Sequence, residues 1–165
     1  MSLLHKFLRQ TKFASYEDFV NNFAIEAPQD FNFAYDVVDA LAAVEPQKTA
    51  LVWCNDHGAE LRLTMREMAE QSAKAANFFK AAGIGKGDRV MLILKRHYTY
   101  WFAVLGLHRL GAVAIPATHQ LMAKDIAYRV QAAKVKMVVT VDEPRLQEAV
   151  DQALGAVATV QRVSL

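Results

Sequence analysis

The sequence predicts an α/β protein with a mostly parallel sheet flanked by helices. Between Arg89 and Thr118, two apolar runs, Val90–Leu94 and Ala112–Pro116, enclose a nearly all-apolar helical segment. This is the pattern of a β-α-β unit with both strands fully buried. Strand-like and helical segments keep alternating after this unit. The connections between them are short, which favours parallel strands joined by right-handed crossovers.

The first 48 residues are expected to form an N-terminal arm and helices, ahead of an α/β subdomain over residues 49–165. Ser15 stands three residues before an acid, which is typical of a helix N-cap. A second helix is predicted over Phe31–Val44, where Glu45-Pro46 stops it. No low-complexity tract divides the chain.

A β-hairpin is predicted next. The strand-like runs Thr49–Trp53 and Glu60–Thr64 flank Asn55–Gly58, which has the composition of a tight turn. Thr64 and Glu67 have the spacing of a capping box, which opens a helix that Gly83 ends.

The rest of the chain repeats helix and strand after the β-α-β unit. The predicted elements are a helix at Ala123–Ala133, a strand at Lys136–Val141, a helix at Arg145–Leu154 and a strand at Val160–Leu165. The β-α-β pattern thus continues through the second half of the chain.

Charge and cysteine content limit the classes of partner and compartment. The chain has 19 basic and 17 acidic residues, scattered without a basic stripe, which argues against a nucleic-acid partner. The single cysteine, Cys54, excludes an internal disulfide and fits a reducing compartment. No membrane span is expected, because basic residues interrupt the longest apolar stretch. We expect a cytoplasmic protein, or one of the mitochondrial matrix if the source is eukaryotic.

Polar side chains follow both strands of the β-α-β unit. Arg96 and His97 come after the first strand, and Thr118 and His119 come after the second. Open parallel sheets bind ligands at the carboxyl ends of their strands, so these residues are candidates for a strand-end cleft. The alternative is that the basic pair caps a strand or meets a neighbouring subdomain.

Other motifs favour structural interpretations. The glycine-rich segment Gly83–Asp88 follows a helix and precedes a strand, which is the reverse of a phosphate-binding loop. His97, His108 and His119 are too far apart for a shared metal ion, so no metal site is predicted. Glu143 precedes a helix start, where acids are favoured by the helix dipole. No catalytic triad or carboxylate pair can be assigned.

Several landmarks together resemble one enzyme family. In order, they are Thr49–Trp53 with the turn at Gly58, the helix from Leu63-Thr64 to Gly83, Gly85–Val90, Trp101–Gly106 with Gly111–Thr118, Asp125–Arg129 and Val138–Glu143. Their order and spacing resemble the opening portion of acyl-CoA synthetases in the adenylate-forming (AMP-binding) superfamily. The acetyl- and medium-chain acyl-CoA synthetase branch is the most similar. The resemblance covers roughly residues 31–145.

The resemblance implies that the full-length enzyme uses Mg-ATP to convert a carboxylic acid to an acyl-adenylate, and then forms a thioester with coenzyme A. The family's Ser/Thr/Gly-rich nucleotide loop, its ribose-binding aspartate and its C-terminal lysine match nothing in this chain. The resemblance therefore implies an incomplete part of a larger adenylation domain, with no catalytic residue and no cofactor bound by this chain alone. Arg145 matches a position where an arginine meets the nucleotide end of coenzyme A.

Two other functions stay open at this point. One is a free-standing, non-catalytic α/β module that binds a ligand or a protein. The other is a small flavodoxin-like enzyme that uses Arg96, His97 and Thr118 in a cleft. Part of a larger enzyme should leave apolar surface uncovered, which would favour homo-oligomers.

Overall fold

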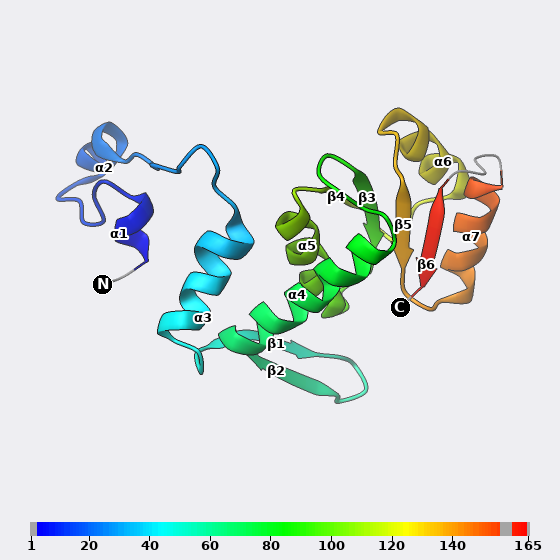
Figure 1. The fold of residues 1–165 in the computed structure, drawn as a ribbon, viewed down its shortest axis with the longest axis horizontal. Helices are drawn as coiled ribbons and strands as arrows, with labels where there is room; N and C mark the ends of the chain where they lie inside the picture. The colour runs from blue at the N-terminus through cyan, green and yellow to red at the C-terminus, as the bar shows by residue number, and fades with distance from the viewer. Residues whose placement is uncertain (1–2, 156–159, 165) are drawn as a thin grey trace.

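The structure is a computed structural model that describes residues 3–155 and 160–164. A four-stranded parallel sheet lies between two layers of helices, with a β-hairpin beside one layer and an N-terminal arm beyond it (Figure 1). The predicted α/β class with a parallel sheet is confirmed.

The sheet has the strand order β4-β3-β5-β6, and every neighbouring pair is parallel. Its strands are β3 (Arg89–Ile93), β4 (Val113–Pro116), β5 (Met137–Thr140) and β6 (Gln161–Ser164). The chain places β4 on one side of β3 and then crosses to place β5 on the other side. Leu165, the last residue of the predicted final strand, lies outside the described residues.

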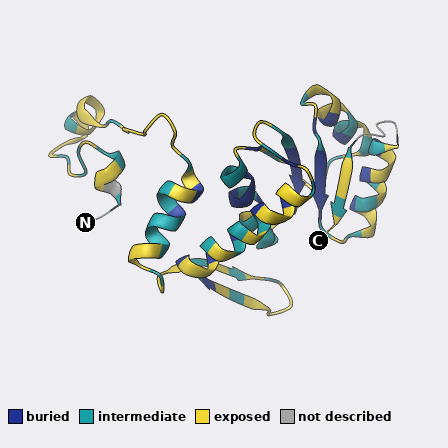
Figure 2. Ribbon diagram, in the orientation of Figure 1, coloured by how far each residue is buried: buried dark blue, intermediate teal, exposed yellow. Residues whose placement is uncertain are grey.

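Helices α4 (Met65–Ala81) and α5 (Thr99–Leu110) cover one face of the sheet, and α6 (Ala123–Ala132) and α7 (Pro144–Leu154) cover the other. Strand β3 serves both cores, because successive side chains of a strand point to opposite faces. Val90 and Leu92 pack with α4 and α5, whereas Met91 and Ile93 pack with α6 and α7. These β3 side chains are all buried (Figure 2).

The expectation that both strands of the β-α-β unit are fully buried is wrong for the second strand. Within the described residues β4 pairs only with β3, and Val113 on β4 is 46% exposed. The apolar run Ala112–Pro116 reads like a central strand, but Pro116 has no backbone N–H and suits a sheet edge.

The hairpin forms a separate two-stranded antiparallel sheet of β1 (Thr49–Cys54) and β2 (Glu60–Thr64). At its turn, Asn55 Oδ1 accepts backbone hydrogen bonds from His57 and Ala59. The predicted capping box then opens α4. Its Thr64 Oγ1 accepts from the Glu67 N–H, and the Glu67 carboxylate accepts from the Thr64 N–H.

The predicted helix over Phe31–Val44 starts later and is not a regular α-helix. It consists of a π-helix, η1 (Ala34–Asp39), followed by α3 (Ala40–Val44). Ala34 and Val38 of η1 are buried in a third core that also contains residues of β2, α4 and α5. This packing attaches the end of the N-terminal region to the α4–α5 layer.

Helices α1 (Leu4–Phe7) and α2 (Tyr16–Asn22) lie at the end of the molecule away from the sheet (Figure 1). The arm is largely exposed, and an edge-to-face contact between the Phe7 and Phe31 rings joins α1 to the segment before η1. The division of the chain at residue 48 stays a prediction.

The region before the hairpin also has polar attachments to α5. The Asn32 side chain donates to the His108 carbonyl oxygen at 2.7 Å. The Arg109 guanidinium donates to both carboxylate oxygens of Asp39, at 2.8 and 2.5 Å, and its Nε donates to Ser72 Oγ at 3.0 Å. Arg109 therefore links η1, α4 and α5.

In the part of the chain that the structure describes, none of the helices combines the length and the apolar character that crossing a bilayer requires.

Candidate functional site

The carboxyl ends of β3 and β5 lie side by side and form the topological switch point of the sheet. After β3 the chain enters α5 on one face, and after β5 it enters α7 on the other. Loops that diverge in this way leave a crevice, and open α/β sheets bind ligands there. An ion pair between Lys95 and Glu143 spans this point.

Lys95 lies in the turn that follows β3, in a left-handed backbone conformation with φ of 53°. The backbone N–H of His97 closes this turn by donating to the Leu94 carbonyl oxygen at 3.0 Å. Glu143 is the N-cap residue of α7, with an extended backbone. The ammonium of Lys95 is the main cause that lowers the pKa of Glu143, and the charges of His119 and Arg145 lower it further.

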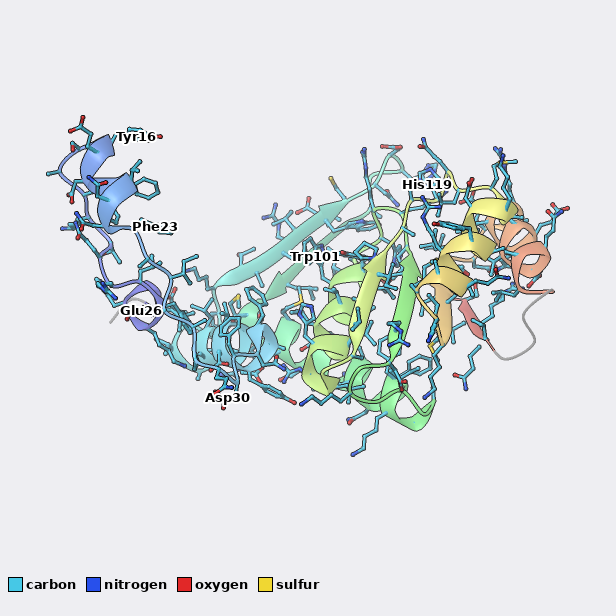
Figure 3. The ribbon with its side chains drawn as sticks, turned by 90° about the horizontal axis from the view of Figure 1, so that it is seen from above. Tyr16, Phe23, Glu26, Asp30, Trp101 and His119 are labelled. Carbon is cyan, nitrogen blue, oxygen red and sulfur yellow. The ribbon has the colours of Figure 1, made fainter. Side chains whose placement is uncertain are left out.

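A cleft of about 420 Å³ lies between the loop after β4 and helix α7. Its polar lining includes His119, Glu143, Arg145 and Glu148. His119 lies at the opposite end of the molecule from the arm that carries Tyr16 and Phe23 (Figure 3). The cleft is thus part of the sheet domain and has no contribution from the arm.

Local sequence rules fix the walls of this cleft. Pro144 occupies the first turn of α7, where its missing N–H costs nothing and its fixed φ suits the helix. On the other wall, the Asp125 carboxylate accepts from the Met122 backbone N–H and opens α6. Both helices therefore begin at the cleft, and helix N-termini carry partial positive charge.

The guanidinium of Arg145 lines the cleft together with the carboxylates of Glu143 and Glu148. Within the described residues, Glu143 forms its ion pair with Lys95, and none joins it to Arg145. The Arg145 side chain is exposed in the first turn of α7. A guanidinium in this position can hold a phosphate group through charge-assisted hydrogen bonds, supported by the two helix N-termini.

The structure brings together three of the four residues expected at the strand ends. Arg96, Thr118 and His119 line a second, smaller pocket of about 320 Å³ with Lys95. His119 also lines the larger cleft, so the two hollows are neighbours. Among the residues that the sequence singled out, Arg145 and His119 line the larger cleft, and Arg145 is absent from the lining of the smaller pocket.

His97 lies apart from these residues, against the hairpin. Its ring is 4.2 Å from the Tyr98 ring and 5.7 Å from the Trp53 ring, between centroids. His97 Nδ1 is 2.8 Å from Thr99 Oγ1. Burial lowers the pKa of this imidazole below 6.5, so the neutral form is favoured in this environment. Its position is that of a packing residue between the turn after β3 and β1.

Sequence reasoning missed Lys95 as a site residue and assigned Glu143 to helix capping alone. The signal for their contact was present, because each follows a buried strand, and parallel strands end at the same edge of a sheet. What the sequence did not supply was that β3 and β5 are neighbours, since β4 lies between them in the chain.

The glycine-rich segment Gly83–Asp88 lies at the opposite end of β3, before its first residue. Asp88 accepts hydrogen bonds of 2.8 Å from the Gly85 backbone N–H and from the Lys136 ammonium. These contacts make the segment a structural turn. Among the described residues, no three His, Cys, Asp or Glu side chains are arranged to hold a metal ion.

Similar sequences point to one family. Residues 38–165 match the family described as AMP-binding enzyme. The chain is 42% identical over 121 residues to the mitochondrial acyl-coenzyme A synthetase ACSM5 of Rattus norvegicus, covering 70% of this chain and 21% of that protein. It is 39% identical over 151 residues to the mitochondrial ACSM3 of Mus musculus, covering 86% and 26% respectively. The chain therefore spans about a quarter or less of the length of these relatives.

Solved structures give the same assignment. A benzoate CoA ligase from Burkholderia xenovorans LB400 superposes with a TM-score of 0.69 at 25% identity, over 82% of this chain and 26% of that one. The N-terminal domain of FACL13 from Mycobacterium tuberculosis superposes with a TM-score of 0.72 at 24% identity, over 81% of this chain and 33% of that one, which supports the fold alone. The resemblance to the N-terminal portion of acyl-CoA synthetases is confirmed, and the chain belongs to the AMP-binding enzyme family.

Proposed function

We propose that this chain forms the N-terminal part of an ATP-dependent acyl-CoA synthetase and that its cleft at Arg145 receives the phosphate-bearing end of coenzyme A. The observation that carries the proposal is the convergence of Arg145, His119 and the N-termini of α6 and α7 on one cleft of about 420 Å³. Family membership makes this interpretation preferable to a free-standing binding module or a flavodoxin-like enzyme.

The reaction we propose for the full-length protein has two steps. A carboxylate attacks the α-phosphate of Mg-ATP, which gives an acyl-adenylate and releases pyrophosphate. The thiol of coenzyme A then attacks the acyl carbon and displaces AMP. The proposed contribution of this chain is to support the adenylation site and to hold one end of coenzyme A, so it has no catalytic residue of its own and no activity alone.

Arg145 suits a phosphate group for a physical reason. A guanidinium has donors in a planar fork that matches two phosphate oxygens, and it remains charged at every physiological pH. Glu148 also lines the cleft and would repel an anion placed near it. We therefore place the phosphate towards Arg145 and His119, and away from Glu148.

Calorimetric titration with adenosine 3′,5′-bisphosphate, which carries the phosphates of that end of coenzyme A, tests this proposal. Arg145→Ala should weaken binding about tenfold, the loss expected for one charge-assisted hydrogen bond. Arg66→Ala is the matched control, because Arg66 is an exposed arginine in the first turn of α4, on the other face of the sheet. Equal affinities for the two variants would contradict a role of Arg145.

The acyl chain length and the cellular location of the full-length protein are part of the same proposal. We expect the full-length protein to accept short or medium acyl chains, which a series of carboxylates from acetate to octanoate, assayed for CoA- and ATP-dependent AMP release, would rank. The relatives ACSM5 and ACSM3 are described as mitochondrial. The cytoplasmic location stays a prediction, with the mitochondrial matrix as its alternative.

We also propose that the chain associates with a second copy of itself. An apolar hollow of about 260 Å³ lies between α4, α5 and β5, with Phe78, Phe102 and Val139 in its lining. Covering such a surface with a second copy would remove apolar area from water. Light scattering over a range of protein concentrations would detect the resulting homo-oligomer.

A further inference from the structure

Lys95 and Arg145 are connected through a shared acidic neighbour. Glu143 is part of the lining of the larger cleft, and Lys95 is not. Lys95 forms an ion pair with Glu143. Glu143 is separated from Arg145 by Pro144 alone. We propose that Lys95 is a positioning residue that holds the Glu143 carboxylate away from Arg145 and so leaves the guanidinium available to an anionic ligand. This inference rests on the proposed role of Arg145.

The charges around Glu143 support this arrangement. Lys95, His119 and Arg145 all act on its carboxylate, and Lys95 has the largest effect because it is in direct contact. If the Lys95 ammonium were removed, the guanidinium of Arg145 would remain as a cation that acts on the Glu143 carboxylate. The carboxylate would then pair with the guanidinium, and an incoming phosphate would have to displace it.

The partial burial of the pair makes the competition effective. The side chains of Lys95 and Glu143 are 37% and 34% exposed, so the pair is less screened by solvent than a fully exposed one. Arg145 is exposed and lies in the first turn of α7, two residues after Glu143. The position of one carboxylate thus decides whether the cleft presents a free cation or a neutral pair.

The backbone at Lys95 has a conformation that is uncommon for lysine, and Lys134 shares it. Its φ of 53° falls in the left-handed region, where glycine is the favoured residue and a side chain with a Cβ is disfavoured. The turn after β3 holds Lys95 in this conformation, and its ammonium forms the ion pair with Glu143.

Titration of the protein with adenosine 3′,5′-bisphosphate, at fixed ionic strength, tests the inference through four variants. Lys95→Ala should weaken binding about tenfold, because the anion then competes with Glu143 for one charge-assisted contact. Lys95→Arg should bind like the parent. Glu143→Gln should bind at least as tightly as the parent. The double variant Lys95→Ala, Glu143→Gln should recover the parental affinity, although it lacks the same lysine.

The recovery separates positioning from direct contact. If the double variant stays as weak as Lys95→Ala, Lys95 itself contacts the anion or supports the loop, and the inference is overturned. If Lys95→Ala binds like the parent while Arg145→Ala is weakened, the inference fails but the proposed function stands. If the parent does not bind the probe, or Arg145→Ala leaves the affinity unchanged, the proposed function itself fails.

Two controls guard the comparison. Lys124→Ala removes a neighbouring cation of α6 that is outside the cleft lining, and it should change the affinity by no more than about twofold, as a screened charge would. Lys95→Gly suits the left-handed backbone and replaces Lys95→Ala if the alanine variant does not fold. Lys95→Gly should lose the same affinity for the probe as Lys95→Ala. Adding Glu143→Gln to Lys95→Gly should recover the parental affinity.

Discussion

The indole N–H of Trp53 donates a hydrogen bond of 2.7 Å to the backbone carbonyl oxygen of Arg96. The bond joins β1 of the hairpin to the turn after β3, one residue beyond the ion-pairing Lys95. The hairpin therefore supports the segment that carries the proposed positioning residue, although it contributes nothing to the cleft lining.

Trp53→Phe should lower the free energy of unfolding by about 1 kcal/mol, the usual net value of one neutral hydrogen bond. Phenylalanine keeps an aromatic ring beside His97 and Tyr98 but cannot donate to the Arg96 carbonyl. Urea denaturation measures the difference. Val52→Thr, at an exposed neighbour on β1, is the control and should be near neutral. An unchanged midpoint for Trp53→Phe would show that the bond contributes nothing.

Gly106→Ala should destabilise the packing of α4 against α5 by about 1–3 kcal/mol, the cost of overpacking. A Cβ at Gly106 would lie 2.8 Å from Ala75 Cβ and 2.8 Å from the Ala76 backbone nitrogen, so two helices would have to separate. Gly85→Ala is the control, because its nearest neighbour would be a side-chain oxygen of Asp88 at 3.9 Å. Thermal unfolding followed by circular dichroism compares the two, and equal midpoints would contradict the close approach.

Arg109→Met should lower the free energy of unfolding by about 2 kcal/mol. The loss of a fully buried ion pair would cost more, but the Asp39 side chain is 37% exposed. The Arg109 side chain itself is only 7% exposed, and its loss leaves Asp39 and the buried Ser72 hydroxyl without their donor. Guanidinium chloride denaturation measures the cost. Adding Asp39→Leu should recover part of it, since no unpaired carboxylate then remains. If the double variant is no more stable than Arg109→Met, the ion pair is not the cause.

Stability should fall as the pH drops below 6.5, because burial lowers the pKa of His97 in the folded state. Between the folded and unfolded pKa values of His97, the unfolded chain binds more protons than the folded one, so acid favours unfolding. The stability that neutral His97 contributes is present above pH 6.5 and is lost as the pH falls through its folded pKa. The carboxylates with lowered pKa values titrate at lower pH, and a His97 variant retains them, so the difference in slope reports the imidazole. Denaturation between pH 5 and 8 should show a shallower slope for His97→Gln, and an unchanged slope would contradict the assignment.

Sequence patterns predicted which segments form helices and which form strands, because hydrophobic periodicity and capping signals are local. The capping box at Thr64 and Glu67 and the structural turn at Gly83–Asp88 both agree with what the sequence predicted. The π-helical geometry of Ala34–Asp39 was not predictable, since it depends on how Ala34 and Val38 fit a core supplied by distant residues. Periodicity does not carry that information.

The candidate site was predictable in its location and less so in its membership. The rule that ligands meet the carboxyl ends of parallel strands selected Arg96, Thr118 and His119, which share a pocket. The same rule selected His97, which the Trp53 and Tyr98 rings hold on the hairpin side. Predicting the contact between Lys95 and Glu143 requires knowing that β3 and β5 are neighbours in the sheet. An apolar run predicts a strand but does not indicate which strand lies beside it.

The strand order also constrains how the chain can be assembled. Strand β3 acquires β4 through a single connecting helix, but its other edge stays unpaired until Met137–Thr140 has been synthesised. During that interval β3, whose last four residues are buried in the native structure, presents free backbone donors and acceptors, which are a template for pairing with another chain. The crossover that places β5 beside β3 is therefore also a step during which a nascent chain exposes a strand edge to aggregation.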